Sequence, residues 1–267
     1  MKDYIKIGLE KGYISLNEDM SRIIYLFQNK EYSYNKPEDK VQAETVLRLI
    51  LDYNYPARRI KQFVPVTMGR EVKEADIIVY EDDACMKPHI LVECKRQEVS
   101  EAEYQQAIEQ AYSYAFALPC DIKYVWVTSG IKSDYFEVDK TQNSRNQMPD
   151  IPQFGVKTVA SYKYVYDAQS LPQIAGEQRF FDLSVIDQAE LTRRFKQAHE
   201  ALWAGGQLNP SEAFDELDKL IFCKIWDERK PRKIGEPYDF QIITVSKEEE
   251  KNENKRRLIE NDNLYKR

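Results

Sequence analysis

The chain has 267 residues, 42% of them hydrophobic and 31% charged, which is typical of a globular protein with one large or two modest domains. Its 39 basic and 45 acidic residues give a net charge of −6, which argues against indiscriminate nucleic-acid binding, because that affinity comes mostly from Lys and Arg. No apolar run reaches membrane-spanning length and the N-terminus lacks a signal-peptide core, so we expect a cytoplasmic protein without a membrane partner.

The first part of the chain mixes helical and strand patterns. Residues 1–34 indicate a helix or two with some strand character. The segment KPEDKVQAETVLRLILDYNYP then predicts a helix that begins at Pro37 and stops before Pro56, because proline fits the first turn of a helix but not its interior. The segment IKQFVPVTMGR, residues 60–70, predicts a strand after this helix.

The stretch from residue 74 to residue 97 carries the most unusual pattern. It reads EADIIVY, a polar loop EDDACMKP, and HILVECKRQ, which predicts a β-hairpin inside a sheet. Because side chains alternate across a strand, Glu93 and Lys95 point to one face and Cys94 to the other. Together with Asp76 they would bring two carboxylates and an amine to the edge of an apolar sheet. Charges buried there are costly unless they pair or hold a metal.

Metal-assisted phosphodiester hydrolysis is the chemistry that uses this set of groups. Asp and Glu oxygens suit Mg²⁺, which lowers the pKa of a bound water. A lysine beside the metal can orient that water or neutralise the charge that develops on phosphorus. Three charged residues at loose spacing are also compatible with an ordinary charged cluster at a solvated strand end, and this motif alone leaves both interpretations open.

The next segments predict a helix and further strands. Residues 101–118 have an alanine-rich helical pattern, in which Gln110 and Tyr114 lie four apart and therefore on one face. Residues 121–139 predict two more strands, which complete a sheet with helices on its faces. Residues 140–178 are rich in turn formers and are expected to be loops that close this domain.

These motifs resemble a known nuclease family. Asp76, 16 intervening residues and Glu93-Cys94-Lys95 resemble the PD-(D/E)xK superfamily, with Ala75 in place of the usual proline. The helix with Gln110 and Tyr114 after the ExK strand is similar to that of the nuclease domain of type I restriction enzyme R subunits. The resemblance implies an α/β fold: a restriction-endonuclease-like mixed sheet flanked by helices, with a small C-terminal helical domain.

The same resemblance implies specific roles and a cofactor. The implied catalytic residues are Asp76, Glu93, Lys95, Gln110 and Tyr114. The implied cofactor is Mg²⁺, with Mn²⁺ as a substitute, bound by Asp76, Glu93 and Glu38. In the family a glutamate directly after the helix proline reaches the metal, which is Glu38 here. Glu44, on a more central turn of the same helix, is the competing choice, and periodicity does not separate the two.

The C-terminal part of the sequence is predicted to be helical and then charged. One amphipathic helix runs to Trp203, Gly205-Gly206 stops it, and Asn209-Pro210-Ser211 opens a second helix. The segment NPSEAFDELDKLIFCKIWDE resembles the helical start of restriction-modification methyltransferase subunits, and a generic helical hairpin is the alternative. We therefore expect a nuclease-like domain over 1–180, a helical domain over 185–230, and a charged linker over 231–267 to a missing downstream region.

These observations together predict a Mg²⁺-dependent endonuclease portion of a type I restriction-modification R protein, which hydrolyses phosphodiester bonds of double-stranded DNA. Its expected partners are double-stranded DNA and the methyltransferase and specificity subunits. Neither a GxxxxGK[ST] phosphate loop nor an (N/D)PP(Y/F) methyltransferase motif occurs in the sequence, so translocation and methyl transfer are expected elsewhere. A stand-alone repair or recombination nuclease of the same fold and a non-catalytic assembly module are the alternatives.

Overall fold

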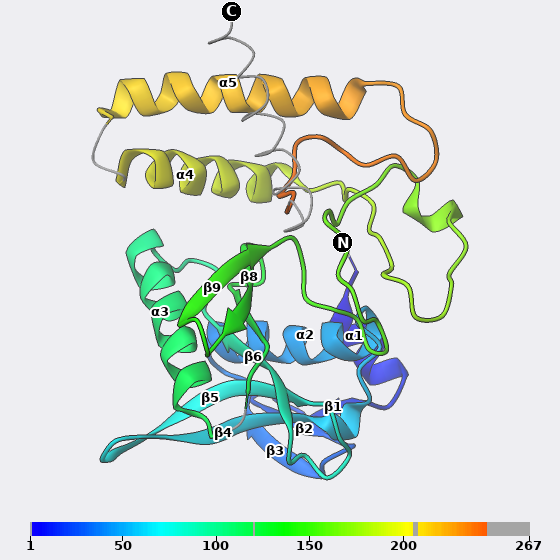
Figure 1. The fold of residues 1–267 in the computed structure, drawn as a ribbon, viewed down its shortest axis with the longest axis vertical. Helices are drawn as coiled ribbons and strands as arrows, with labels where there is room; N and C mark the ends of the chain where they lie inside the picture. Colours follow the sequence, from blue (N-terminus) through cyan, green and yellow to red (C-terminus); the bar gives the residue numbers. More distant parts are fainter. Residues whose placement is uncertain (1, 120, 205–207, 245–267) are drawn as a thin grey trace, which may run out of the picture.

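The computed structural model describes residues 2–119, 121–204 and 208–244 (Figure 1). The predicted Gly205-Gly206 stop and residues 245–267 of the expected linker lie outside these ranges. The described helices are α1 (Tyr4–Glu10), α2 (Pro37–Leu51), α3 (Glu101–Ala117), α4 (Gln188–Ala204) and α5 (Pro210–Arg229), with short 3-10 turns η1 (Ala57–Arg59) and η2 (Ala168–Ser170). The predicted helices after Pro37, Ser100 and Asn209 are all present.

Two sheets accompany these helices. The smaller contains β1 (Ile14–Leu16), β2 (Arg22–Tyr25) and β3 (Lys30–Ser33). The larger is ordered along the chain as β4 (Ile60–Met68), β5 (Glu71–Tyr80), β6 (Pro88–Cys94), β7 (Tyr124–Thr128), β8 (Ser133–Asp139) and β9 (Ser144–Met148). Strand β9 lies in a segment that we expected to be loop. It is a polar, partly exposed edge strand, and its sequence lacks the alternating apolar residues that predict a strand.

The larger sheet is mixed. Its neighbouring strands are antiparallel except for β6 and β7, which run parallel. A parallel pair needs a long crossover, and α3 supplies it between these two strands. The predicted hairpin is confirmed by the antiparallel register in which Ile77 faces Val92 and Ile78 faces Leu91. The architecture is therefore a mixed α/β sheet flanked by helices, as the sequence predicted.

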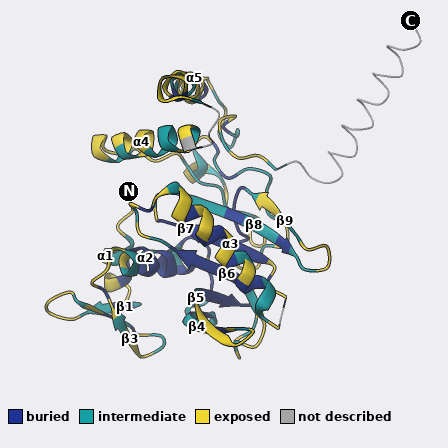
Figure 2. Cartoon of the chain, turned by 90° about the vertical axis from the view of Figure 1, so that its left-hand side faces the viewer, coloured by how far each residue is buried: buried dark blue, intermediate teal, exposed yellow. Residues whose placement is uncertain are grey.

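Alternation along the strands creates an apolar core on each face of the large sheet. Ile77, Val79 and Val92 pack with residues of α2, whereas Ile78 and Leu91 pack with residues of α3. All five residues of β7 are buried, as expected for a central strand covered on both sides. Figure 2 shows β6 and α2 as mostly buried, while α4 and α5 carry much exposed surface.

Caps at the helix starts explain where α3 and α5 begin. The Ser100 side chain accepts a hydrogen bond from the Glu103 N–H, and the Glu103 carboxylate accepts one from the Ser100 N–H. Asn209 and Glu212 form the same reciprocal pair at α5. Such capping boxes satisfy backbone donors that a helix start would otherwise leave unpaired.

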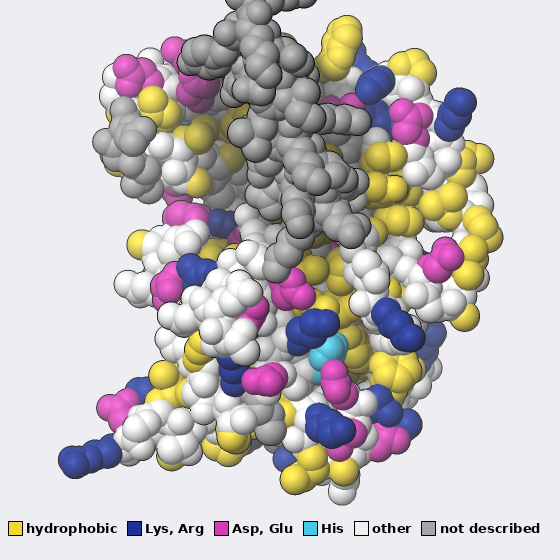
Figure 3. Space-filling model, in the orientation of Figure 1, with side chains coloured by type: hydrophobic (Ala, Val, Ile, Leu, Met, Phe, Trp, Pro, Cys, Tyr) yellow, Lys and Arg dark blue, Asp and Glu magenta, His cyan; other side chains and the backbone are white. Residues whose placement is uncertain are grey.

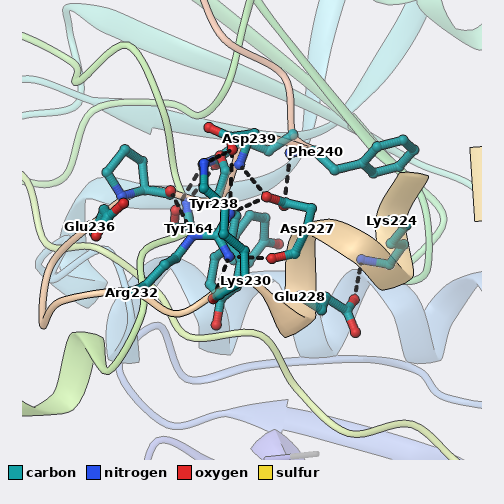
Figure 4. A network of polar contacts seen from close by, with 12 residues as sticks. Tyr164, Lys224, Asp227, Glu228, Lys230, Arg232, Glu236, Tyr238, Asp239 and Phe240 are labelled. Carbon is teal, nitrogen blue, oxygen red and sulfur yellow. Dashed lines mark hydrogen bonds and ion pairs between the residues drawn. The ribbon is translucent and has the colours of Figure 1, made fainter. Parts of the chain in front are cut away.

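The segment after α5 turns back onto the molecule. Asp227, near the end of α5, accepts hydrogen bonds from the backbone N–H groups of Asp239 and Phe240 and pairs with Arg232 (Figure 4). Further along, Gln241 accepts hydrogen bonds from the backbone of Lys163 and Tyr164. Residues 231–244, which we expected in a charged linker, are thus bound to an earlier part of the chain.

Helix α4 contacts the loop that follows β6. Arg193 Nη1 donates to Gln97 Oε1 at 2.9 Å, and Gln197 Nε2 donates to the Gln97 carbonyl at 3.4 Å.

Within the described ranges, no helix combines the length and the apolar character needed to cross a membrane.

Candidate active site

Strands β5 and β6 bring the three residues of the predicted ExK motif together. Asp76 Oδ2 accepts a hydrogen bond of 2.7 Å from the Cys94 N–H, which ties its carboxylate to the end of β6. Lys95 Nζ lies 2.8 Å from Glu93 Oε1. The Lys95 N–H donates to the Thr128 carbonyl, so the backbone that carries the lysine is fixed on β7. Glu93 and Lys95 were predicted to point to the same face, and the contact between their side chains confirms this.

Helix α3 adds the two neutral polar residues. Gln110 Nε2 donates to Glu93 Oε1 at 3.1 Å and to the Tyr114 hydroxyl at 2.8 Å. Tyr114 is buried, and its ring packs with the residues that fill the face beneath α3. Both side chains therefore face the carboxylate cluster, as their spacing on the helix predicted, although their catalytic roles stay predictions.

Helix α2 distinguishes the two candidate glutamates. Glu38, in the first turn, places Oε1 3.7 Å from Lys95 Nζ. Glu44 instead lies in the electrostatic surroundings of Tyr34, Asp3 and Arg48. Of the two candidate glutamates, Glu38 is the one in contact with the cluster.

One residue of this site was missed by the sequence reasoning. Gln42 is buried on α2, and its Nε2 donates to the backbone carbonyl of Asp76 at 3.1 Å. This bond links the helix to the strand that carries the first carboxylate. The signal in the sequence was a lone amide on the apolar face of VQAETVL, a position that normally needs a hydrogen-bond partner.

Burial makes the carboxylates unusually weak acids. It raises the pKa of Asp76 to about 6, despite the hydrogen bond from the Cys94 N–H. Burial and the neighbouring negative charge of Asp76 raise the pKa of Glu93 to about 8. Burial acts to lower the pKa of Lys95, but Glu93 outweighs it and raises that pKa above the ordinary value. Lys95 therefore carries a positive charge at neutral pH.

The carboxylate oxygens fit a hard divalent cation. Glu93 is 2% exposed, and its Oε2 has no hydrogen-bond partner among the described residues. A buried oxygen of this kind is costly unless something binds it. Across the part of the chain that the structure describes, no three Asp, Glu, His or Cys side chains gather closely enough to form a metal site by themselves. Mg²⁺ is commonly held by one or two carboxylates together with water, so Asp76 and Glu93 suffice.

Comparison with known proteins agrees with this geometry. Residues 37–152 match the family described as type I restriction enzyme R protein N terminus (HSDR_N). The match begins at the first residue of α2 and includes the whole candidate site. This part of the chain is therefore similar to the N-terminal region of those R proteins.

Among solved structures, a "putative nuclease belonging to DUF820" from Anabaena variabilis ATCC 29413 is similar, with 15% sequence identity over 55% of this chain and 85% of that one. The TM-score is 0.28. No curated protein matches the chain significantly.

Proposed function

We propose that the chain is the DNA-cleaving portion of a type I restriction-modification R protein, a Mg²⁺-dependent endonuclease that hydrolyses phosphodiester bonds of double-stranded DNA. The observation that carries this proposal is the Glu93 carboxylate. One of its oxygens accepts hydrogen bonds from Lys95 and Gln110, and the other is buried and has no hydrogen-bond partner among the described residues. Two buried acids with raised pKa values and an adjacent cation indicate a functional site.

Asp76 and Glu93 would hold Mg²⁺, with Mn²⁺ as a substitute ion. Glu38, whose carboxylate contacts Lys95, is proposed to reach the ion through one of the waters that Mg²⁺ keeps. Bound there, the ion supplies Lewis-acid stabilisation and a water of lowered pKa. Lys95, charged and fixed at the end of β6, stabilises negative charge on the phosphoryl oxygens in the transition state. Gln110 and Tyr114 offer neutral donors that orient Glu93 or a backbone phosphate without adding charge.

The rest of the chain has a proposed role in assembly. We propose that residues 1–180 form the nuclease domain and 185–230 a helical domain similar to the start of methyltransferase subunits. The proposed partners are the methyltransferase and specificity subunits of a restriction-modification complex. The exposed apolar side chains of α5, among them Phe222 and Trp226, support a role for this helix in contact with another protein.

A plasmid-nicking assay tests the function, in parallel with Mn²⁺ binding followed by electron paramagnetic resonance. We expect cleavage that needs Mg²⁺ or Mn²⁺ and is lost in Asp76→Asn and Glu93→Gln, with loss of Mn²⁺ binding in the same variants. Cleavage that persists in both variants would contradict the proposal. A folded protein that neither binds Mn²⁺ nor cleaves DNA, alone or with partner subunits, would instead favour the non-catalytic assembly module.

A further inference from the structure

Strands β4 and β5 extend well beyond the rest of the large sheet. Their register continues from the pair Ile60 and Val79 out to Met68 and Glu71. By contrast, β6 pairs with β5 only between residues 77 and 80. Residues 64–75 therefore form a two-stranded ribbon whose strands pair only with each other. Figure 1 shows this ribbon projecting from the sheet at the lower left.

The ribbon leaves the sheet at the end where the candidate site lies. Because β5 and β6 are antiparallel, moving from Ile77 toward the start of β5 corresponds to moving from Val92 toward Glu93 and Lys95. Asp76 is thus the last residue of β5 before the ribbon. At about 3.3 Å per residue, the tip at Arg70 lies roughly 20 Å from Asp76 along the strand.

One face of the ribbon is anchored and the other is open. Val66 is fully buried, and Val64 and Met68 pack with it against the residues under α3. Val72 is 65% exposed, and its register partner Thr67 is exposed as well. A hairpin held in this way is a stiff projection, and its open face has no partner within the described chain.

Basic side chains stand at the end of the ribbon (Figure 3). Arg70 is exposed at the tip, and no ion pair of the described residues includes it. Lys73 lies 2.7 Å from Glu71 in an ion pair open to solvent and also acts electrostatically on Tyr114 of the site. Glu74 is exposed at the base. An exposed pair is weak, so Lys73 can exchange Glu71 for a phosphate at little cost.

We propose that this ribbon, residues 64–75, enters the major groove of double-stranded DNA next to the scissile phosphate at the candidate site, with Arg70 in the groove and Lys73 on the backbone. The inference rests on the proposed function and adds the element that positions the duplex. The major groove, about 12 Å wide, admits a two-stranded β-ribbon, whereas the minor groove is about half as wide. A reach of roughly 20 Å from the site spans the groove beside the scissile phosphate.

The test measures DNA binding by fluorescence anisotropy without divalent ions, on the full chain carrying Lys95→Ala so that cleavage plays no part. Two variants disable the ribbon: Arg70→Ala, and a shortened ribbon in which Asn-Gly replaces Thr67 to Val72. The replacement removes two residues from each strand, which preserves the side-chain alternation, and Asn-Gly favours the tight turn required. Arg22→Ala, an exposed arginine of the small sheet, is the matched control.

We expect Arg70→Ala and the shortened ribbon to weaken binding of a random duplex by about fivefold or more and to reduce the slope of log Kd against log salt by about 1. The control should change neither. Wild-type protein should protect guanine N7, which lies in the major groove, from dimethyl sulfate, and the shortened ribbon should lose that protection. Circular dichroism shows whether the shortened variant is folded, and Arg70→Ala provides the test if it is not.

Unchanged affinity and salt slope in both ribbon variants would overturn the inference, as would a wild-type chain that binds no duplex DNA. These results are separable from a failure of the proposed function. That function fails if Asp76→Asn or Lys95→Ala still cleaves DNA, whereas anisotropy in the absence of divalent ions reports the ribbon's contact alone.

Discussion

Gln110 Nε2 lies 3.1 Å from Glu93 Oε1, which joins the middle of α3 to the end of β6. The second proton of this amide is directed at the Tyr114 hydroxyl, 2.8 Å away. The orientation of the buried glutamate thus depends on a side chain from another element. Donors placed in this way fix the direction in which the remaining oxygen, Oε2, points.

Replacement of Gln110 by alanine should reduce the cleavage rate by about tenfold or more, equally on all DNA sequences, because the amide orients Glu93 and carries no sequence information. The variant is compared with wild type in a nicking assay on several plasmids. Gln106→Ala, an exposed glutamine of the same helix, is the control and should cleave normally. A rate for Gln110→Ala equal to that of the control would remove Gln110 from the site.

Lys95→Ala should abolish detectable cleavage, since loss of a charge that stabilises the transition state typically costs about 3 kcal/mol or more. Its fold should remain, and thermal unfolding at neutral pH should change little, because the pKa of Glu93 is raised to about 8 and this carboxyl group is protonated when the lysine is absent. Lys132→Ala breaks an ion pair with Glu101 of the same 2.8 Å length outside the site and serves as the control. Wild-type cleavage by Lys95→Ala would refute the assigned role.

The stability of the metal-free protein should fall as pH rises. Asp76 and Glu93 have pKa values of about 6 and about 8 when folded, above the ordinary values of about 3.9 and 4.3 for exposed acids. The folded state therefore binds protons more tightly, and the free energy of unfolding decreases from about pH 4 until both groups are ionised near pH 8. The two pKa shifts together correspond to a loss of up to about 8 kcal/mol.

Urea unfolding in EDTA between pH 5 and pH 9 measures this loss. Glu93→Gln should flatten the curve, and Mg²⁺ should restore stability at pH 8 by binding the ionised carboxylates. A pH profile that is the same for Glu93→Gln and wild type would show that Glu93 does not titrate in this range.

A second buried ion pair provides a structural prediction away from the site. Lys163 Nζ lies 3.0 Å from Asp150 Oδ2 and 3.0 Å from the Tyr135 hydroxyl, with both charged residues buried. Lys163→Met should destabilise the protein by about 3–5 kcal/mol, because it leaves the Asp150 carboxylate without its cation. Urea unfolding measures the change. Adding Asp150→Asn to Lys163→Met should recover part of it, and a double variant less stable than the single one would contradict this account.

Local features of the sequence determined most of the elements and the core of the candidate site. Alternation along a strand placed Glu93 and Lys95 on one face, and a spacing of four placed Gln110 and Tyr114 on one face of α3. Both are properties of a few consecutive residues, so they hold wherever the elements pack. Pro37 and the segment Asn209-Pro210-Ser211 likewise predicted the starts of α2 and α5.

Only the tertiary structure decided which residues of distant elements meet at the site. Periodicity could not separate Glu38 from Glu44, because the answer depends on how α2 lies against the end of the sheet, where Glu38 meets Lys95. The same packing brings Gln42 to the backbone of Asp76. The contact of Gln241 with residues 163 and 164 likewise joins segments more than seventy residues apart. No pattern within a helix or strand records such contacts, since they arise when whole elements bury their apolar faces against one another.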